Sequence, residues 1–144
     1  MDPIDKNYSN DDSLRINEAS KSFLLETAKW AKFLSIVGFV FIGLIVLGAL
    51  FVGAAGSAFG GIGAMGGGLI AFIYILIAVL YFFPIFYLFK ASVALKEGLL
   101  ANDEGALTNG FENLKSHYKF VGILTIVILS FYVLVLLIAM LGAL

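Results

Sequence analysis

Residues 33–89 contain no Asp, Glu, Lys, Arg or His, and this uncharged run limits the fold more than any other feature of the chain. A helix needs about 20 apolar residues to cross the hydrocarbon core of a bilayer, so the run is long enough for two crossings and a connection. A second uncharged run, residues 120–144, is long enough for one more. A chain of 144 residues has too little polar surface to cover three helices that are apolar on all sides. The pattern predicts an all-α integral membrane protein with three transmembrane helices in contact with the lipid bilayer.

We place the three spans at about residues 33–52, 69–89 and 120–141, where Leu, Ile, Val and Phe dominate. Residues 21–144 then form the membrane domain, and residues 1–20 form a polar tail whose composition predicts disorder. The apolar run starts too late and is too long for a cleavable signal peptide, so we expect the first span to act as an uncleaved anchor.

The positively charged residues predict the orientation of the chain. All nine Lys and Arg residues lie before the first span or between the second and the third: Lys6, Arg15, Lys21, Lys29, Lys32, Lys90, Lys96, Lys115 and Lys119. Segments rich in Lys and Arg beside membrane spans stay in the cytoplasm. We therefore expect a multi-pass protein of the inner (cytoplasmic) membrane, with its N-terminus in the cytoplasm and its C-terminus outside.

The connection between the first two spans, residues 53–68, is rich in glycine and contains the motif G-x-G-x-x-G at Gly61–Gly66. This motif binds a dinucleotide when it follows a strand, opens a helix and precedes an acidic residue by about 20 positions. Here a membrane span precedes the motif, and the next acidic residue is Glu97, beyond the second span. We therefore expect no nucleotide at this segment.

Other structures fit the glycine-rich segment better. A flexible outer loop is one, because runs of glycine resist regular structure. A helix-packing face is another, since Ala49, Gly53 and Ser57 recur every four residues and small side chains let two helix backbones approach in a bilayer. A re-entrant or pore-lining backbone is a third, which bilayers accept only where protein or water covers it.

Residues 90–119, between the second and third spans, hold most of the polar side chains of the membrane domain and predict an amphipathic cytoplasmic helical hairpin. We expect Asn102 to cap the second helix of this hairpin. A stripe of apolar side chains recurs at helical spacing along that second helix: Leu107, Phe111, Leu114 and Tyr118. The stripe either packs against the extension of the second span or forms a docking face for a partner.

Residues that carry catalysis or bind metals are absent or isolated. The chain has no cysteine, and its one histidine, His117, has no paired carboxylates nearby in the sequence. Thr125 and Ser130 lie within the third span without a base to activate them. The net charge of −1 gives no basis for nucleic-acid binding. We expect a protein that is not an enzyme and takes no cofactor, metal or nucleic acid.

The segment from Tyr81 to Val127 contains "YFFP" at residues 81–84 and "FENLKSHYKF" at residues 111–120. It resembles an uncharacterised family, a domain of unknown function, found in small membrane proteins of Bacteroidota-type bacteria. With the first span, the resemblance extends over about three quarters of the chain and leaves out the acidic tail and the glycine-rich segment. It implies a membrane location and this architecture, and it implies no activity.

Two functions fit these observations. The first is a non-enzymatic scaffold or accessory subunit that assembles with itself or with another membrane protein and presents residues 90–119 to the cytoplasm. The second is a small homo-oligomeric channel or pore, lined by Ser35, Thr125, Ser130 and glycines. A membrane-disrupting protein of the phage type also fits the size and the number of spans. A coupled carrier is disfavoured, because it needs an ionisable residue at membrane depth and the spans have none.

Overall fold

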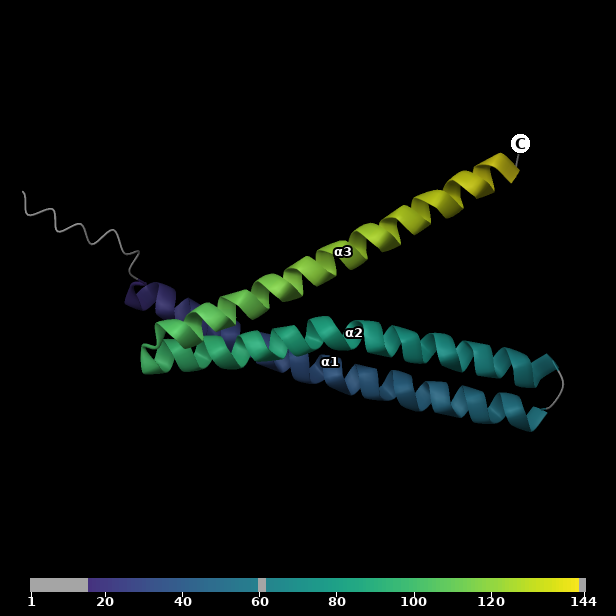
Figure 1. Ribbon diagram of the computed structural model, residues 1–144, viewed down its shortest axis with the longest axis horizontal. Coiled ribbons are helices and arrows are strands. Elements are labelled where there is room, and N and C mark those ends of the chain that lie inside the picture. Colours follow the sequence, from purple (N-terminus) through teal and green to yellow (C-terminus); the bar gives the residue numbers. More distant parts are fainter. Residues whose placement is uncertain (1–15, 60–61, 143–144) are drawn as a thin grey trace, which may run out of the picture.

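The computed structural model describes residues 16–59 and 62–142, without the side chains of Ser57, Phe59 and residues 62–65. The described residues form three helices: α1 (Glu18–Phe59), α2 (Ile62–Ala101) and α3 (Glu104–Gly142) (Figure 1). The predicted all-α fold is confirmed for this part of the chain. Most of the predicted polar tail, residues 1–15, lies outside the described residues.

The tail prediction is wrong at its C-terminal end, because α1 already begins at Glu18. Asn17 caps this helix: its side-chain oxygen accepts a hydrogen bond of 2.7 Å from the backbone nitrogen of Ser20. The helix then continues without a break into the first apolar segment.

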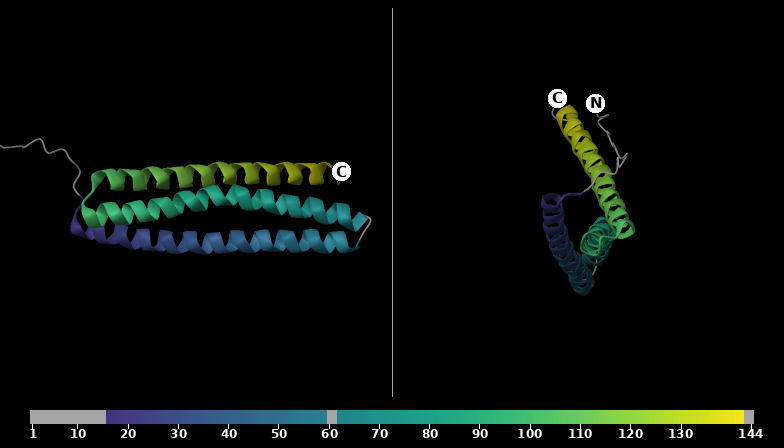
Figure 2. Two further views of the ribbon diagram at one scale, coloured as in Figure 1. Left: turned by 60° about the horizontal axis from the view of Figure 1, so that its bottom comes forward. Right: turned by 90° about the vertical axis from the view of Figure 1, so that its left-hand side faces the viewer.

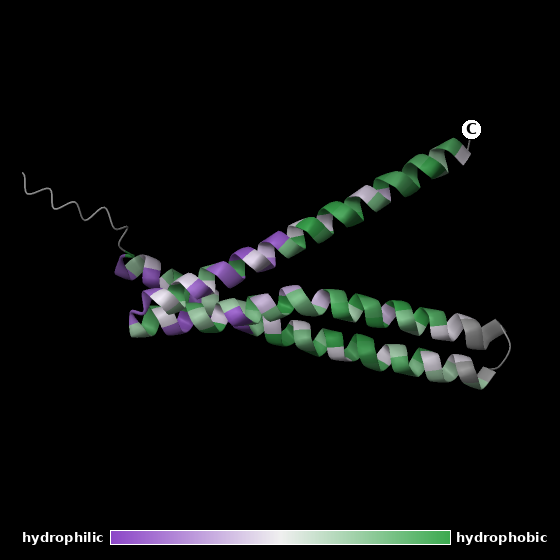
Figure 3. Cartoon of the chain, in the orientation of Figure 1, coloured by the Kyte–Doolittle hydropathy of each residue, from purple (hydrophilic) through white to green (hydrophobic). Residues whose placement is uncertain are grey.

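Each helix is about twice as long as a membrane crossing requires. The three helices have 42, 40 and 39 residues, which corresponds to about 60 Å each, against a hydrocarbon core of about 30 Å. All three are long and apolar enough to cross a membrane, which confirms the prediction of three helices that could span it and suggests a multi-pass membrane protein. The excess length carries the charged residues, which gather at the end of the molecule where α2 leads into α3 (Figure 3).

Helices α1 and α2 lie antiparallel along their whole length, while α3 contacts α2 only near the charged end and then diverges (Figures 1 and 2). The divergence leaves the most apolar window of α3 with none of its residues buried, against 17% of the corresponding window of α2. The fold is therefore a long helical pair with a third helix attached at one end.

Small side chains fill the contact between α1 and α2. Most of the buried residues of these two helices have a small side chain or none: Ala28, Ala31, Ser35, Ala49, Gly67, Ala78, Ala91, Ser92 and Gly98. The buried hydroxyls donate to backbone oxygens of their own helices, Ser35 to Lys32 and Ser92 to Phe89, each over 2.7 Å. Short side chains with satisfied hydroxyls allow the two backbones to approach closely within the membrane.

The glycine-rich segment differs from the expected flexible loop of residues 53–68. Helix α1 continues to Phe59 and α2 begins at Ile62, so that most of the segment is helical and the connection is confined to residues 60–61, outside the described residues. The physical reason lies in the contact between the helices. A Cβ atom added at Gly67 would lie 2.8 Å from the Cα atom of Gly56, so the glycines allow an approach that larger residues would prevent.

In the turn between α2 and α3, the residue that caps α3 differs from the predicted Asn102. Asn102 ends α2 with a φ of 51°, in the left-handed region that asparagine tolerates, and the backbone nitrogen of Asp103 donates to the oxygen of Gly98 over 3.0 Å. Asp103, and not Asn102, caps α3: its Oδ1 atom accepts from the backbone nitrogens of Gly105 (2.8 Å) and Ala106 (3.1 Å). Two adjacent residues thus end one helix and begin the next.

Candidate functional site

Two glycines, one on each helix, allow α2 and α3 to come into close contact. A Cβ atom at Gly98 of α2 would lie 2.5 Å from the backbone nitrogen of Leu107 of α3. A Cβ atom at Gly110 of α3 would lie 2.8 Å from the backbone nitrogen of Leu95 of α2. Gly110 is buried, and Leu95 is only 1% exposed. These glycines hold the charged ends of α2 and α3 at backbone contact.

The apolar stripe of α3 is divided by this contact. Leu107 and Leu114 are half-buried beside Gly110, whereas Phe111 is 43% exposed and Tyr118 is 66% exposed. Helix α2 therefore packs against the two leucines of the stripe, and the two aromatic side chains stay exposed at the edge of the α2–α3 contact. Phe111 also lines a groove between the turn of the hairpin and the start of α1, where Lys21 donates to the side-chain oxygen of Asn102 over 3.2 Å.

His117 marks the point at which α3 leaves α2. Its Nδ1 atom lies 2.7 Å from the backbone oxygen of Pro84, and since a carbonyl only accepts, Nδ1 carries the proton in this contact. One turn further along α3, the ring of Phe120 lies 6.3 Å from that of Phe83. Pro84 is inside α2, where its ring removes a backbone donor from the helix. The sequence showed His117 only as a lone histidine and gave no sign of this partner, because nothing in the sequence relates residues 33 positions apart.

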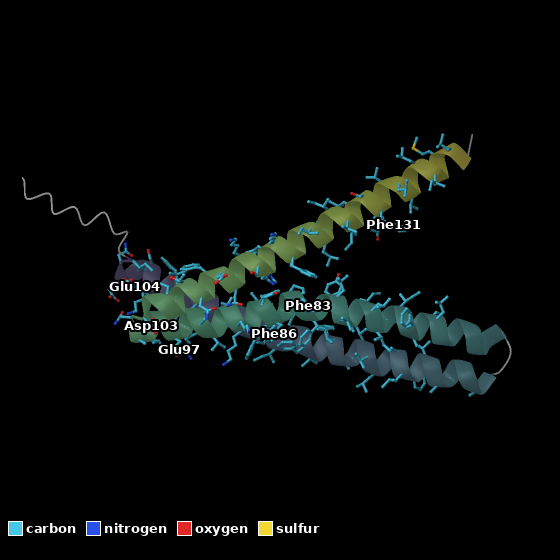
Figure 4. All side chains as sticks on the ribbon, in the orientation of Figure 1. Phe83, Phe86, Glu97, Asp103, Glu104 and Phe131 are labelled. Carbon is cyan, nitrogen blue, oxygen red and sulfur yellow. The ribbon has the colours of Figure 1, made fainter. Side chains whose placement is uncertain are left out.

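Beyond Phe120, α3 presents large apolar side chains on all sides. Phe131 is 64% exposed and Tyr132 also 64%, and Figure 4 shows Phe131 on the part of α3 that stands away from the other helices. The threonine and serine hydroxyls of this half bond to their own helix, Thr125 to the oxygen of Val121 and Ser130 to that of Ile126, over 2.8 Å each. This half of α3 therefore exposes a mainly apolar surface, on which the hydroxyls of Thr125 and Ser130 are already hydrogen-bonded.

The predicted helix-packing face has one fully buried member. Ala49 has no exposed surface, and a Cβ atom at Gly53 would meet the Cβ atom of Ala71 at 3.4 Å, an ordinary contact with α2. The side chain of Ser57 lies outside the described residues. A closer backbone approach of α1 and α2 falls at Gly56 and Gly67, outside the predicted face.

No group of three or more His, Cys, Asp or Glu residues suited to a metal ion occurs within the described part of the chain. In the same residues, every buried side-chain nitrogen or oxygen atom has a hydrogen-bond partner. The buried hydroxyls of Ser35 and Ser92, for example, bond to backbone oxygens of their own helices.

A family model matches residues 57–140, which include most of the glycine-rich segment, all of α2 and all but the last two residues of α3. The predicted resemblance included the first span and left out the glycine-rich segment. The matched residues instead leave out nearly all of α1 and include most of that segment. No significant match to a curated protein or to a solved structure is found. Because the matched residues make up more than half of the chain, the protein belongs to DUF5362, a family of unknown function.

Proposed function

We propose that this protein is a non-enzymatic scaffold or accessory subunit of the inner (cytoplasmic) membrane, acting through helix packing and a cytoplasmic helical hairpin. In this proposal α3 provides the surface for assembly with a second copy or with another membrane protein. The hairpin formed by the charged ends of α2 and α3 provides a second, polar surface.

The observation that carries the proposal is the contrast within the membrane between α3 and the other two helices. Helices α1 and α2 are in contact through small residues and have 6% and 17% of their apolar windows buried, whereas 0% of the apolar window of α3 is buried among the described residues. Helices that associate in lipid do so through packing and interhelical hydrogen bonds. A membrane helix that is packed at one end and exposed over the rest of its length is well placed to accept a helix from a partner.

The hairpin supports the same proposal from the polar side. Phe111 and Tyr118 remain exposed at the edge of the α2–α3 contact, and exposed aromatic side chains are frequent at protein interfaces. The Lys residues described by the structure lie in the charged ends of the helices, which supports an N-terminus and a hairpin in the cytoplasm and a C-terminus outside.

Cysteine cross-linking tests the assembly surface directly, because the natural chain has no cysteine. We expect oxidation of single-cysteine variants along the exposed half of α3, such as Phe131→Cys and Leu134→Cys, to give covalent dimers or a covalent partner in native membranes. The matched control is Ala78→Cys, which is 3% exposed in the α1–α2 contact and should stay monomeric. If the α3 variants stay monomeric and bring down no partner, the proposal is wrong.

The channel alternative loses one of its lining residues, because Ser35 is fully buried between α1 and α2. Reconstitution into liposomes separates the two functions. The scaffold predicts vesicles that retain a trapped small dye at any protein density, whereas leakage that rises with protein density would support a pore.

A further inference from the structure

A groove of about 500 Å³ lies between α1 and α2 where their charged ends meet the uncharged segments. Its rim carries three lysines, Lys29 and Lys32 from α1 and Lys96 from α2. Small buried residues form its base, since Ala28 and Ser92 are each 1% exposed. The close approach of the two helices therefore creates a hollow with cations from both sides.

The described side chains that line this groove carry more positive than negative charge. Among the described residues, Lys29, Lys32 and Lys96 have neither an ion pair within 4.0 Å nor a hydrogen bond from their side chains. Glu97 is the one carboxylate that lines the groove, so three cations face one anion. The groove on the other side of α2 has the opposite balance, with Lys90 facing Glu97 and Glu112.

The groove also lies at the depth of lipid headgroups. Phe33 follows Lys32 directly, begins the uncharged run and is 55% exposed in the groove. Trp30 is 60% exposed beside it, with its ring perpendicular to that of Phe33 at 5.8 Å. Tryptophan rings collect at the level of the headgroups, and basic pockets between membrane helices bind anionic headgroups.

The apolar part of the lining continues toward the hydrocarbon. Ile36 lies one turn below Lys32 on α1 and is 48% exposed, and Val93 faces the groove from α2 with 39% exposed. A free phosphate ion gains nothing by contact with apolar side chains, whereas an acyl chain packs favourably against them. Cations above and exposed apolar side chains below match the two parts of one phospholipid molecule.

We propose that this groove binds one anionic phospholipid, with its phosphate among Lys29, Lys32 and Lys96 and an acyl chain along Phe33, Ile36 and Val93. The site is independent of the scaffold function, since it uses neither α3 nor a protein partner. It also ties α1 to α2 through the lipid at the membrane surface.

Native mass spectrometry of the full chain, released from micelles that contain equal amounts of phosphatidylglycerol and phosphatidylcholine with the same acyl chains, tests the proposal. We expect about tenfold preferential retention of phosphatidylglycerol by the natural sequence. The double variant Lys32→Gln/Lys96→Gln should lose this preference. The control Lys115→Gln/Lys119→Gln removes equal charge from α3, outside the groove, and should keep the preference within about twofold.

Three further measurements keep the proposal falsifiable. Lys29→Glu alone should lower the preference at least threefold, which covers the case that the double variant is poorly folded, and circular dichroism checks the helices of each variant. Millimolar inorganic phosphate should not displace the lipid. Equal retention of both lipids, equal loss in both double variants, or displacement by inorganic phosphate would each overturn the site.

Discussion

The two halves of α3 form one continuous helix but relate to the rest of the molecule in opposite ways. The half that carries the charges, residues 104–119, lies so close to α2 that Gly110 has no room for a Cβ atom. The apolar half, residues 120–142, leaves α2 after the contact between Phe83 and Phe120, and none of its apolar window is buried among the described residues (Figure 1).

The difference follows from the solvent that each half is built for. In water, a helix gains stability by burying an apolar stripe against protein, so the polar half of α3 needs α2. In lipid, the hydrogen bonds of the helix are already satisfied and acyl chains solvate apolar side chains, so large residues give little drive to associate. Helices α1 and α2 associate in the apolar region because small residues such as Ala49 and Ala78 line their contact.

The largest expected effect comes from adding a side chain to the packed half of α3. Gly110→Leu would place atoms within 2.7 Å of the Leu95 side chain and 2.8 Å of its backbone nitrogen. We expect a loss of about 1–3 kcal/mol in the free energy of unfolding in mixed micelles, because the backbone of α2 must move.

The matched control is Gly122→Leu in the apolar half of the same helix, where a Cβ atom would have nothing within 4 Å. This variant should unfold like the natural sequence or slightly later, since leucine favours helix over glycine. Equal loss of unfolding free energy in the two variants would contradict the proposed difference between the two halves of α3.

A smaller effect is expected at the cap of α3. Asp103→Ala removes the acceptor of the hydrogen bonds from Gly105 and Ala106 and should cost about 1 kcal/mol of unfolding free energy. Asp103→Asn keeps a capping oxygen and should retain most of the stability, as measured by denaturant titration followed by circular dichroism. Equal loss in both variants would indicate that the carboxylate has another role.

The contact at the branching point of α2 and α3 should matter to a similar or lesser degree. His117→Ala removes the hydrogen bond to the oxygen of Pro84 and should cost about 0.5–1.5 kcal/mol. Tyr118→Phe is the control, because the Tyr118 side chain is 66% exposed and no hydrogen bond of its hydroxyl occurs within the described residues. Thermal unfolding in micelles should separate the two variants, and a larger shift from Tyr118→Phe would contradict the assignment.

The smallest effect is expected in the apolar half. Ser130→Ala removes a hydroxyl that bonds only to its own helix, at Ile126, and should change the free energy of unfolding by less than about 0.5 kcal/mol. A clear loss of stability, or of dimers in the cross-linking assay, would show that Ser130 faces a partner.

The sequence predicted the parts of this fold that depend on composition. Uncharged length indicated three membrane helices, and the position of the lysines indicated one charged end, because both follow from the cost of placing charge in hydrocarbon. The glycine-rich segment was harder, since glycine serves both flexible loops and close helix contacts. Its helical structure depends on Gly56 and Gly67 meeting across two helices, which is a tertiary contact that no local pattern specifies.

The same limit applies to the candidate sites. The spacing of the residues predicted the stripe from Leu107 to Tyr118. Its division into packed and exposed residues depends on Gly110, which has no side chain and therefore adds nothing to a hydrophobic pattern. The groove with Lys32 and Lys96 joins residues more than 60 positions apart, and only the antiparallel register of α1 and α2 brings them together.

The central claim is that α3 is held to α2 at the charged end and stands apart from it in the membrane. Pulsed electron paramagnetic resonance on spin-labelled double-cysteine variants, diluted to one copy per lipid nanodisc, tests this most directly. The pair Val93/Glu112 should give a short, narrow distance distribution, and the pair Leu69/Leu137 should give a clearly longer and broader one. Short and narrow distances for both pairs would show a closed bundle of three helices and contradict the account.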